Sequence, residues 1–131
     1  MNHAIPAIGR LLLAIIFIIS GLMKLAAPDD TAAAIASVGL PFARAGLVLA
    51  IAVTLGGGLM LAAGYRTRTA AAGLAVFTLV AGLLFHGQIG EREQMIHLLK
   101  NLALAGGLLQ VMAFGAGAWS IDGRMARAGG R

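Results

Sequence analysis

Hydrophobic residues fill four long stretches of the chain, and the short segments between these stretches hold most of its charges. A run of about 20 apolar residues is long enough for an α-helix to cross the hydrocarbon core of a bilayer. The sequence predicts four such spans, at about 5–25, 45–64, 69–86 and 94–115. It therefore predicts an all-α integral membrane protein, a single domain folded as a four-transmembrane-helix bundle.

A short segment between the first two spans has a different pattern. Pro-Asp-Asp-Thr at 28–31 is typical of a chain break followed by a helix start, and Gly-Leu-Pro at 39–41 is typical of a helix end. The piece between them, Ala32 to Val38, is too short and too weakly apolar to cross a membrane. We expect a short interfacial helix here, and a loose basic tail at 122–131.

The composition excludes several classes of protein. Hydrophobic residues make up 60% of the chain and charged residues 11%, whereas soluble domains average roughly 25% charged residues. Cysteine is absent, which excludes disulfides and thiolate metal sites within the chain. The net charge is +5, but the cations are scattered singly at the ends of the spans, so we do not expect a nucleic-acid partner.

The distribution of the cations predicts how the spans are oriented. Four spans place both termini on one side, which carries Arg10, Arg66, Arg68, Arg124, Arg127 and Arg131. The other side carries fewer cations, and acidic residues dilute them: Lys24, Arg44, Arg92 and Lys100 against Asp29, Asp30, Glu91 and Glu93. Positively charged loops stay in the cytoplasm. We therefore expect a protein of the cytoplasmic (inner) membrane with both termini in the cytoplasm.

The first span carries a cation near each end. Arg10 and Lys24 are fourteen residues apart, or about 21 Å along a helix axis, which is less than the ~30 Å hydrocarbon thickness. Each side chain must therefore either extend outward to the membrane surface or face a polar interior. Outward extension is the simpler interpretation for both residues.

Nearly all the polarity of the spans falls in the outer half of the membrane. The candidate residues are Ser20, Lys24, His86, His97, Lys100 and Asn101. Ionisable groups inside a membrane are costly and usually face a bundle interior or a cavity. Two ammonium groups, imidazoles and an amide would suit an anion or the carbonyl oxygens of a quinone. A structural role stays open, because Lys100 could instead form an ion pair with Glu93 or Asp29 at the interface.

The start of the fourth span places several of these residues on one helix face. His97, Lys100 and Asn101 are at i, i+3 and i+4, and Gly107 follows Lys100 by two turns. We predict that Lys100 faces the bundle interior, where the glycine allows another helix to come close. The expected lipid-facing positions of this helix are Leu98, Leu102 and Leu109.

Small residues four positions apart mark two faces suited to close helix contact. These pairs are Gly58 with Ala62 and Ala103 with Gly107.

No metal site is expected, because His86, His97 and the nearby glutamates match no tight ligand motif. Haem attachment and phosphate-binding motifs are absent from the sequence as well.

The motifs and their order resemble the DoxX family of small four-span membrane proteins. The resemblance covers about residues 10–122 and rests on Arg10 with Phe17, Ser20-Gly21-Leu-Met-Lys24, Gly39-Leu40-Pro41, Gly57-Gly58-Leu, Gly64-Tyr-Arg66-Thr-Arg68, Phe85-His86, Leu99-Lys100-Asn101, Gly106-Gly107-Leu-Leu and Gly115-Ala-Gly117-Ala-Trp-Ser120-Ile-Asp122.

This resemblance implies a redox setting. The family takes its name from a subunit of thiosulfate:quinone oxidoreductase, and relatives are associated with quinone-linked or redox-stress membrane complexes. One departure concerns the second span, where many members carry a glutamate just before the glycines and this chain has Thr54. The acid that would pair with Lys24 or Lys100, or relay protons, is therefore missing.

Two functional hypotheses follow. In the first, the protein is a redox-associated subunit of a quinone-linked oxidoreductase that binds a quinone or a small anion in an outer-leaflet pocket. His86 would be its proton partner, and the ligand would be held by Lys24, Lys100, Asn101, Ser20 and His97. Because the chain has no cofactor-binding motif, electrons would come from a partner protein or from the substrate. In the second, the protein is a non-catalytic scaffold of a larger complex.

Both hypotheses involve the same partners. These are the lipid bilayer and either another protein or a second copy of the chain. Solute transport is a third class, but it needs a polar path through both halves of the membrane, and the inner half offers little beyond Thr54.

Overall fold

Among the residues that the computed structural model describes, four helices are long and apolar enough to cross a membrane. The structure describes residues 2–85 and 90–130, and these residues form no β-strand. The spans are α1 (Ala4–Ala26), the continuous helix Ala43–Ala63, α5 (Thr67–Phe85) and α6 (Arg92–Phe114). The predicted all-α, four-span membrane fold is confirmed, and His86, the last residue of the predicted third span, lies outside the described residues.

The second span changes its helix type midway. It consists of α3 (Ala43–Ile51), the π-helical segment η1 (Ala52–Gly56) and α4 (Gly57–Ala63). Within η1 the Thr54 hydroxyl donates a hydrogen bond to the Ala50 carbonyl at 2.6 Å. Such side-chain bonds to the i−4 carbonyl compete with the backbone ladder, and π-helical bulges occur frequently at functional sites.

The described part of the chain also forms two short helices outside the spans. The expected short helix is present as α2 (Pro28–Ser37) and begins earlier than predicted, because proline fits the first helical turn, where no N–H is needed. The prediction of a loose tail was wrong, since α7 (Ile121–Gly129) is helical. The Ser120 hydroxyl accepts a hydrogen bond from the Gly123 N–H at 2.9 Å and so caps α7.

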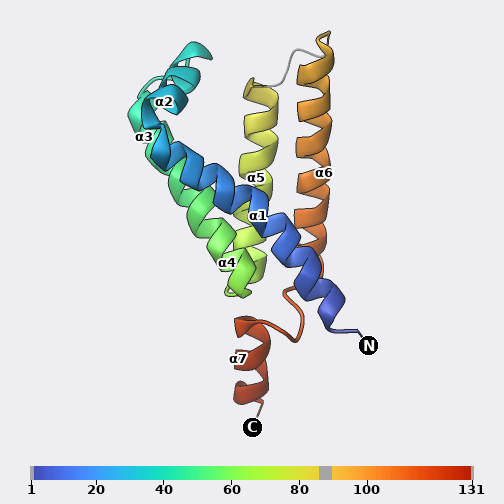
Figure 1. Ribbon diagram of the computed structural model, residues 1–131. Helices are drawn as coiled ribbons and strands as arrows, with labels where there is room; N and C mark the ends of the chain where they lie inside the picture. Colours follow the sequence, from blue (N-terminus) through green and yellow to red (C-terminus); the bar gives the residue numbers. More distant parts are fainter. Residues whose placement is uncertain (1, 86–89, 131) are drawn as a thin grey trace.

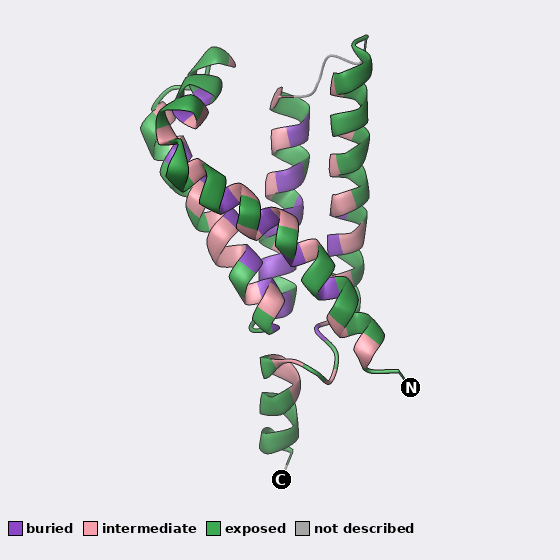
Figure 2. Cartoon of the chain, viewed as in Figure 1, coloured by how far each residue is buried: buried purple, intermediate pink, exposed green. Residues whose placement is uncertain are grey.

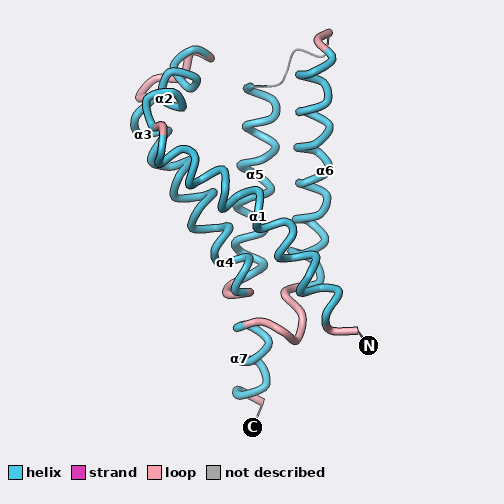
Figure 3. The backbone as a smooth tube through the Cα atoms, in the orientation of Figure 1, coloured by secondary structure: helices cyan, strands magenta, loops and turns pink. Residues whose placement is uncertain are grey.

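The spans form two arms that meet at one end of the molecule and diverge at the other (Figure 1). One arm contains α1 packed along η1 and α4, with α2 on α3; the other contains α5 packed along α6. The arms are joined mainly where α4 contacts α5, and the tube in Figure 3 shows the short turn that links these two helices. Buried residues gather where α1 crosses this junction (Figure 2), and the core there contains Ala14, Phe17, Leu61, Ala71, Leu74, Ala75 and Leu108.

Glycines allow α1 to press directly on the second span. A Cβ at Gly21 would lie 2.8 Å from the Cβ of Leu55, and a Cβ at Gly58 would lie 3.0 Å from Ile18. Neither position has room for a side chain. The close contact predicted from the small residue at 58 is confirmed.

Arg10 holds the end at which the two arms meet. Its side chain is 4% exposed, and its guanidinium donates to the carbonyls of Ala116 at 2.5 Å and Trp119 at 3.0 Å, with a longer bond of 3.4 Å to Ala62. The outward extension expected for Arg10 was therefore wrong. The reason is that the chain after α6 turns back at Gly115, with φ of +81°, and brings its carbonyl groups to the guanidinium.

Asp122 stabilises the same end of the molecule through hydrogen bonds to the start of α5. Its carboxylate accepts hydrogen bonds from the Arg66 N–H at 2.9 Å, the Thr67 N–H at 2.8 Å and the Thr67 hydroxyl at 2.7 Å. Burial acts to raise the pKa of Asp122, but these hydrogen bonds and the nearby Arg10 guanidinium lower it below its ordinary value. The start of α7 is thereby fixed to the N-terminus of α5, where a negative charge is favoured.

Replacing Arg10 should destabilise the fold. In Arg10→Met the carbonyls of Ala116 and Trp119 lose their donor, which should cost about 3 kcal/mol or more. Arg10→Lys should restore only part of this loss, since an ammonium lacks the planar fork of donors. Thermal unfolding in detergent measures the effect, with the exposed Arg92→Met as control. Equal melting temperatures for Arg10→Met and Arg92→Met would contradict this role of Arg10.

Asp122 should make stability depend on pH. Because its pKa is lowered by folding, its contribution is present above the ordinary carboxyl range near pH 4 and is lost as pH falls through the folded-state value. The carboxylate is partly exposed, so Asp122→Asn should cost only about 1–2 kcal/mol at neutral pH. Melting curves of the wild type and Asp122→Asn should converge below about pH 4. A constant gap at every pH would show that the charge is not responsible.

Candidate functional site

A cavity of about 390 Å³ lies where the two arms diverge. Small-molecule sites typically measure about 300–1,000 Å³ and have mostly apolar walls with a few converging polar groups. The walls of this cavity come from both arms and are largely apolar; they include Ile16, Phe17, Leu49, Phe77, Leu84 and Leu104. The polar residues that border it are Ser20, Lys24, Thr31, Thr54, Thr78 and Asn101.

Lys24 and Ser20 form a polar pair on the α1 side of the cavity. They are one helical turn apart, and the Lys24 ammonium donates to the Ser20 hydroxyl at 2.5 Å. Lys24 is partly buried, and no other charged residue lines the cavity within the described part of the chain. Lys24 therefore faces a polar interior group rather than extending outward, which corrects the simpler expectation.

Asn101 enters the cavity from α6. Its amide nitrogen donates to the backbone carbonyl of Thr78 at 3.2 Å. The side chain packs over Gly82 of α5, where an added Cβ would lie 3.0 Å from that amide nitrogen. The glycine thus gives Asn101 room to lie between α5 and α6, and the hydrogen bond fixes its position at the cavity wall.

Two buried threonines border the cavity from opposite arms and differ in their hydrogen bonding. Thr54 is 1% exposed, and its hydroxyl is bonded to its own helix. Thr78 is 4% exposed, and its hydroxyl oxygen has no hydrogen-bond partner among the described residues. A buried hydroxyl without a partner costs about 1–3 kcal/mol. Because a helical threonine has two accessible rotamers, this hydroxyl is able to turn toward a ligand in the cavity.

Sequence reasoning did not identify Thr78 as a site residue. A usable signal was present, since Thr78 precedes Gly82 by four residues and so shares its helix face. Identifying it would have required knowing that this face of α5 meets Asn101 of α6.

The structure brings only part of the predicted site together. Ser20, Lys24 and Asn101 line one cavity, whereas His97 and Lys100 are exposed and do not line it. The predicted His86 lies outside the described residues, although Phe85 beside it in sequence lines the cavity.

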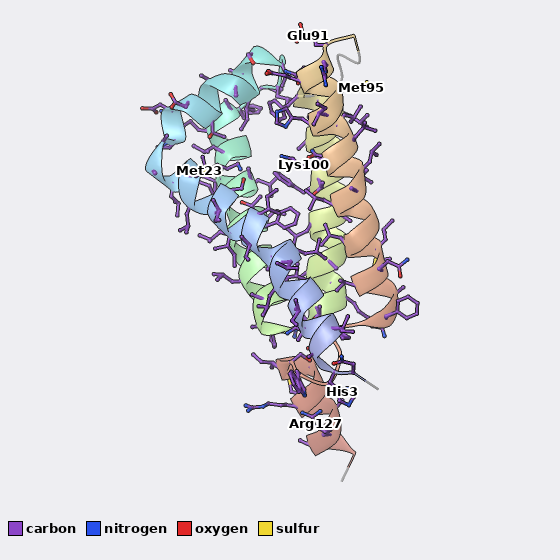
Figure 4. All side chains as sticks on the ribbon, turned by 45° about the vertical axis from the view of Figure 1, so that its right-hand side comes forward. His3, Met23, Glu91, Met95, Lys100 and Arg127 are labelled. Atoms are coloured by element: carbon purple, nitrogen blue, oxygen red, sulfur yellow. The ribbon has the colours of Figure 1, made fainter. Side chains whose placement is uncertain are left out.

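Lys100, which we predicted to face the bundle interior, has an exposed side chain that does not line the cavity. The helix face was assigned correctly: one turn further along α6 Leu104 lines the cavity, and at Gly107 an added Cβ would lie 3.2 Å from Leu13 of α1. Figure 4 shows Lys100 on this α1-facing side of α6. At the level of Lys100 the arms have already separated, so α1 no longer covers it.

The described residues contain no group of three or more histidine, aspartate or glutamate side chains placed to hold a metal ion. What the cavity offers is one ammonium, one amide and several hydroxyls around an apolar space. Such a site can hold and orient a small ring compound through oxygen atoms at its edge.

The four candidate spans within the described residues define a multi-pass helical membrane protein. The model of the DoxX family matches residues 5–87, and the chain belongs to the DoxX family. Two curated relatives are the inner membrane proteins YqjF and YphA of Escherichia coli (strain K12). YqjF is 36% identical over 115 residues, covering 88% of this chain and 87% of the relative. YphA is 30% identical over 122 residues, covering 89% and 87%. No solved structure matches the chain.

Proposed function

We propose that the cavity between the two arms binds the head group of a quinone. The protein would then be a redox-associated subunit of a quinone-linked oxidoreductase in the membrane. The observation that carries this proposal is the buried Thr78 hydroxyl, which has no hydrogen-bond partner among the described residues and lies beside a largely apolar cavity. A ligand that places an oxygen near Thr78 supplies the missing hydrogen bond. Phe17 and Phe77 provide flat apolar surfaces for a ring.

The charges around the cavity favour a neutral ligand over a small anion. Lys24 is the one charged group that the described residues contribute to the lining. An anion would lose its hydration in an apolar space with a single cation to compensate it. Quinone oxygens are neutral acceptors, so donors such as Lys24, Thr78 and Asn101 suffice to hold them.

The residues of the chain would bind, orient and protect the ligand. Lys24 would hold a proton beside one oxygen, Thr78 and Asn101 would fix another part of the ring, and the apolar walls would exclude water. A quinone takes up two electrons and two protons to become a quinol, and the electrons would come from a partner protein or from its substrate. His86, which follows the cavity-lining Phe85, remains our candidate for delivering protons.

The scaffold hypothesis remains the alternative. It was motivated by glycines suited to close helix contact, and Gly21, Gly58 and Gly107 contact other helices of this same chain. A scaffold would not need the cavity, so changes to its lining would leave the scaffold function intact.

We further place the protein in the cytoplasmic membrane with both termini in the cytoplasm. The names of the two relatives support the inner membrane. The end that carries the termini also carries four described surface arginines: Arg66, Arg68, Arg124 and Arg127. At the opposite end Arg44 forms an ion pair with Asp29, which reduces the positive charge there.

Quinone binding by the protein in lipid nanodiscs tests the proposed site. Thr78→Val and Asn101→Leu should each weaken the binding of a benzoquinone by about two- to tenfold, because each removes one hydrogen-bonding group. Thr78→Val should leave the unliganded protein equally stable or slightly more so, since the lost hydroxyl has no partner there.

Matched controls come from the same helices. Thr69→Val on α5 and Gln110→Leu on α6 change exposed positions away from the cavity and should leave binding unchanged. No quinone binding by the wild type, or equal losses in the control variants, would reject the quinone site. An unimpaired complex in cells carrying Thr78→Val would then favour the scaffold alternative.

The topology can be tested with single cysteines, because the chain has none of its own. Ser37→Cys lies at the end of α2 and Met125→Cys on α7, and both positions are exposed. A membrane-impermeant maleimide should label Ser37→Cys from outside the cytoplasmic membrane and Met125→Cys only after that membrane is opened. The reverse pattern would show that the termini face outward.

A further inference from the structure

A second cavity lies alongside α1, next to the one between the arms. It is a groove of about 600 Å³ formed by α1 and the start of α2. Its α1 wall includes Ile15, Ile19 and Met23, which are 50%, 51% and 66% exposed. Figure 4 shows Met23 on the α1 arm, across the molecule from Met95 and Lys100 of α6. In a membrane, exposed apolar side chains of a spanning helix contact lipid, so the groove borders the bilayer.

The groove and the cavity between the arms share a wall. Four residues line both of them: Ile16, Ser20, Lys24 and Thr31. The hydrogen-bonded pair of Lys24 and Ser20 therefore stands at the junction of a lipid-facing groove and the proposed head-group site. Lys24 and Ser20 are the polar groups that α1 contributes at this junction. The other α1 side chains that line the groove are apolar.

We propose that the groove between α1 and α2 holds the hydrocarbon tail of the same ligand, whose head group enters the cavity sideways past Lys24. This inference rests on the proposed quinone site and deepens it, because it assigns the ligand to the membrane-dissolved, tailed members of its class. The cavity of about 390 Å³ takes a ring, and a long chain attached to that ring needs a continuous apolar path outward.

The apolar α1 wall of the groove meets this need next to Lys24, where the head group would bind, whereas the α2 wall carries the polar residues Asp30 and Thr31. The tail would gain little free energy from burial, because lipid is as apolar as the groove. We therefore expect the groove to admit the tail rather than to supply most of the affinity. Blocking the groove should exclude tailed ligands by steric conflict and leave tailless ones able to bind.

The test compares two probes and a matched pair of variants in lipid nanodiscs. The probes are a benzoquinone with a decyl chain and the same benzoquinone without the chain. Ile19→Trp fills the groove, whereas Leu22→Trp adds the same bulk at a position of α1 that is 52% exposed and lies outside the groove. Met23→Trp is a second groove variant, for use if Ile19→Trp does not fold.

Ile19→Trp should weaken binding of the decyl probe by about tenfold and leave the tailless probe unchanged, and Leu22→Trp should change neither. Equal effects of Ile19→Trp on both probes, or no effect on either, would overturn the tail site while the head-group site stands. If the wild type binds neither probe, the proposed function itself is wrong and the tail site is rejected with it.

Discussion

The buried guanidinium of Arg10 is the constraint on which the rest of the structure depends. An arginine within a membrane span needs acceptors, and here the carbonyls of Ala116 and Trp119 supply them. This requirement holds the chain after α6 against α1 and the end of α4. At the opposite end the described ion pair is the exposed one between Arg44 and Asp29, which joins neighbouring elements of a single arm. The arms are thus fixed together at one end and separate at the other.

The cavity follows from this one-sided closure. Close contacts at Gly21 and Gly58 hold α1 against the second span, so the cavity opens between the arms rather than between these two helices. The two buried threonines of the cavity differ in whether their hydroxyl groups are hydrogen-bonded. Thr54 satisfies its hydroxyl within its own helix, whereas Thr78 has no partner in the described residues. A site of this kind is suited to an apolar ring that carries an oxygen, which is the basis of the proposed function.

Features set by local sequence could be predicted, and those set by contacts between distant segments could not. Apolar length alone identified the four spans, and the chain break at 28–31 identified α2. The two shorter hydrogen bonds of Arg10 are to a segment more than a hundred residues away, so hydropathy pointed instead to outward extension. The tail was expected to be loose because its glycines and charges were visible, while the capping of α7 by Ser120 was not recognised.

The candidate site shows the same limit. Ser20, Lys24 and Asn101 were identified because polar residues inside apolar spans are costly. Lys100 was assigned the correct helix face, but how far α1 extends over that face depends on the divergence of the arms. Thr78 was missed because a single threonine in a span is unremarkable until its neighbours are known. The role of Thr54 in a π-helical segment likewise depends on backbone geometry that composition does not encode.

The central claim is that a ring compound binds between the two arms, and photo-crosslinking tests it most directly. An azido-benzoquinone would be irradiated with the protein in lipid nanodiscs, and the labelled residues would be mapped by mass spectrometry. The account predicts labels on the cavity-lining parts of α1, α5 and α6, near Ser20, Thr78 and Leu104, and their suppression by excess unlabelled quinone. Labels spread over the lipid-facing surfaces of the helices, or labels that excess quinone does not suppress, would contradict it.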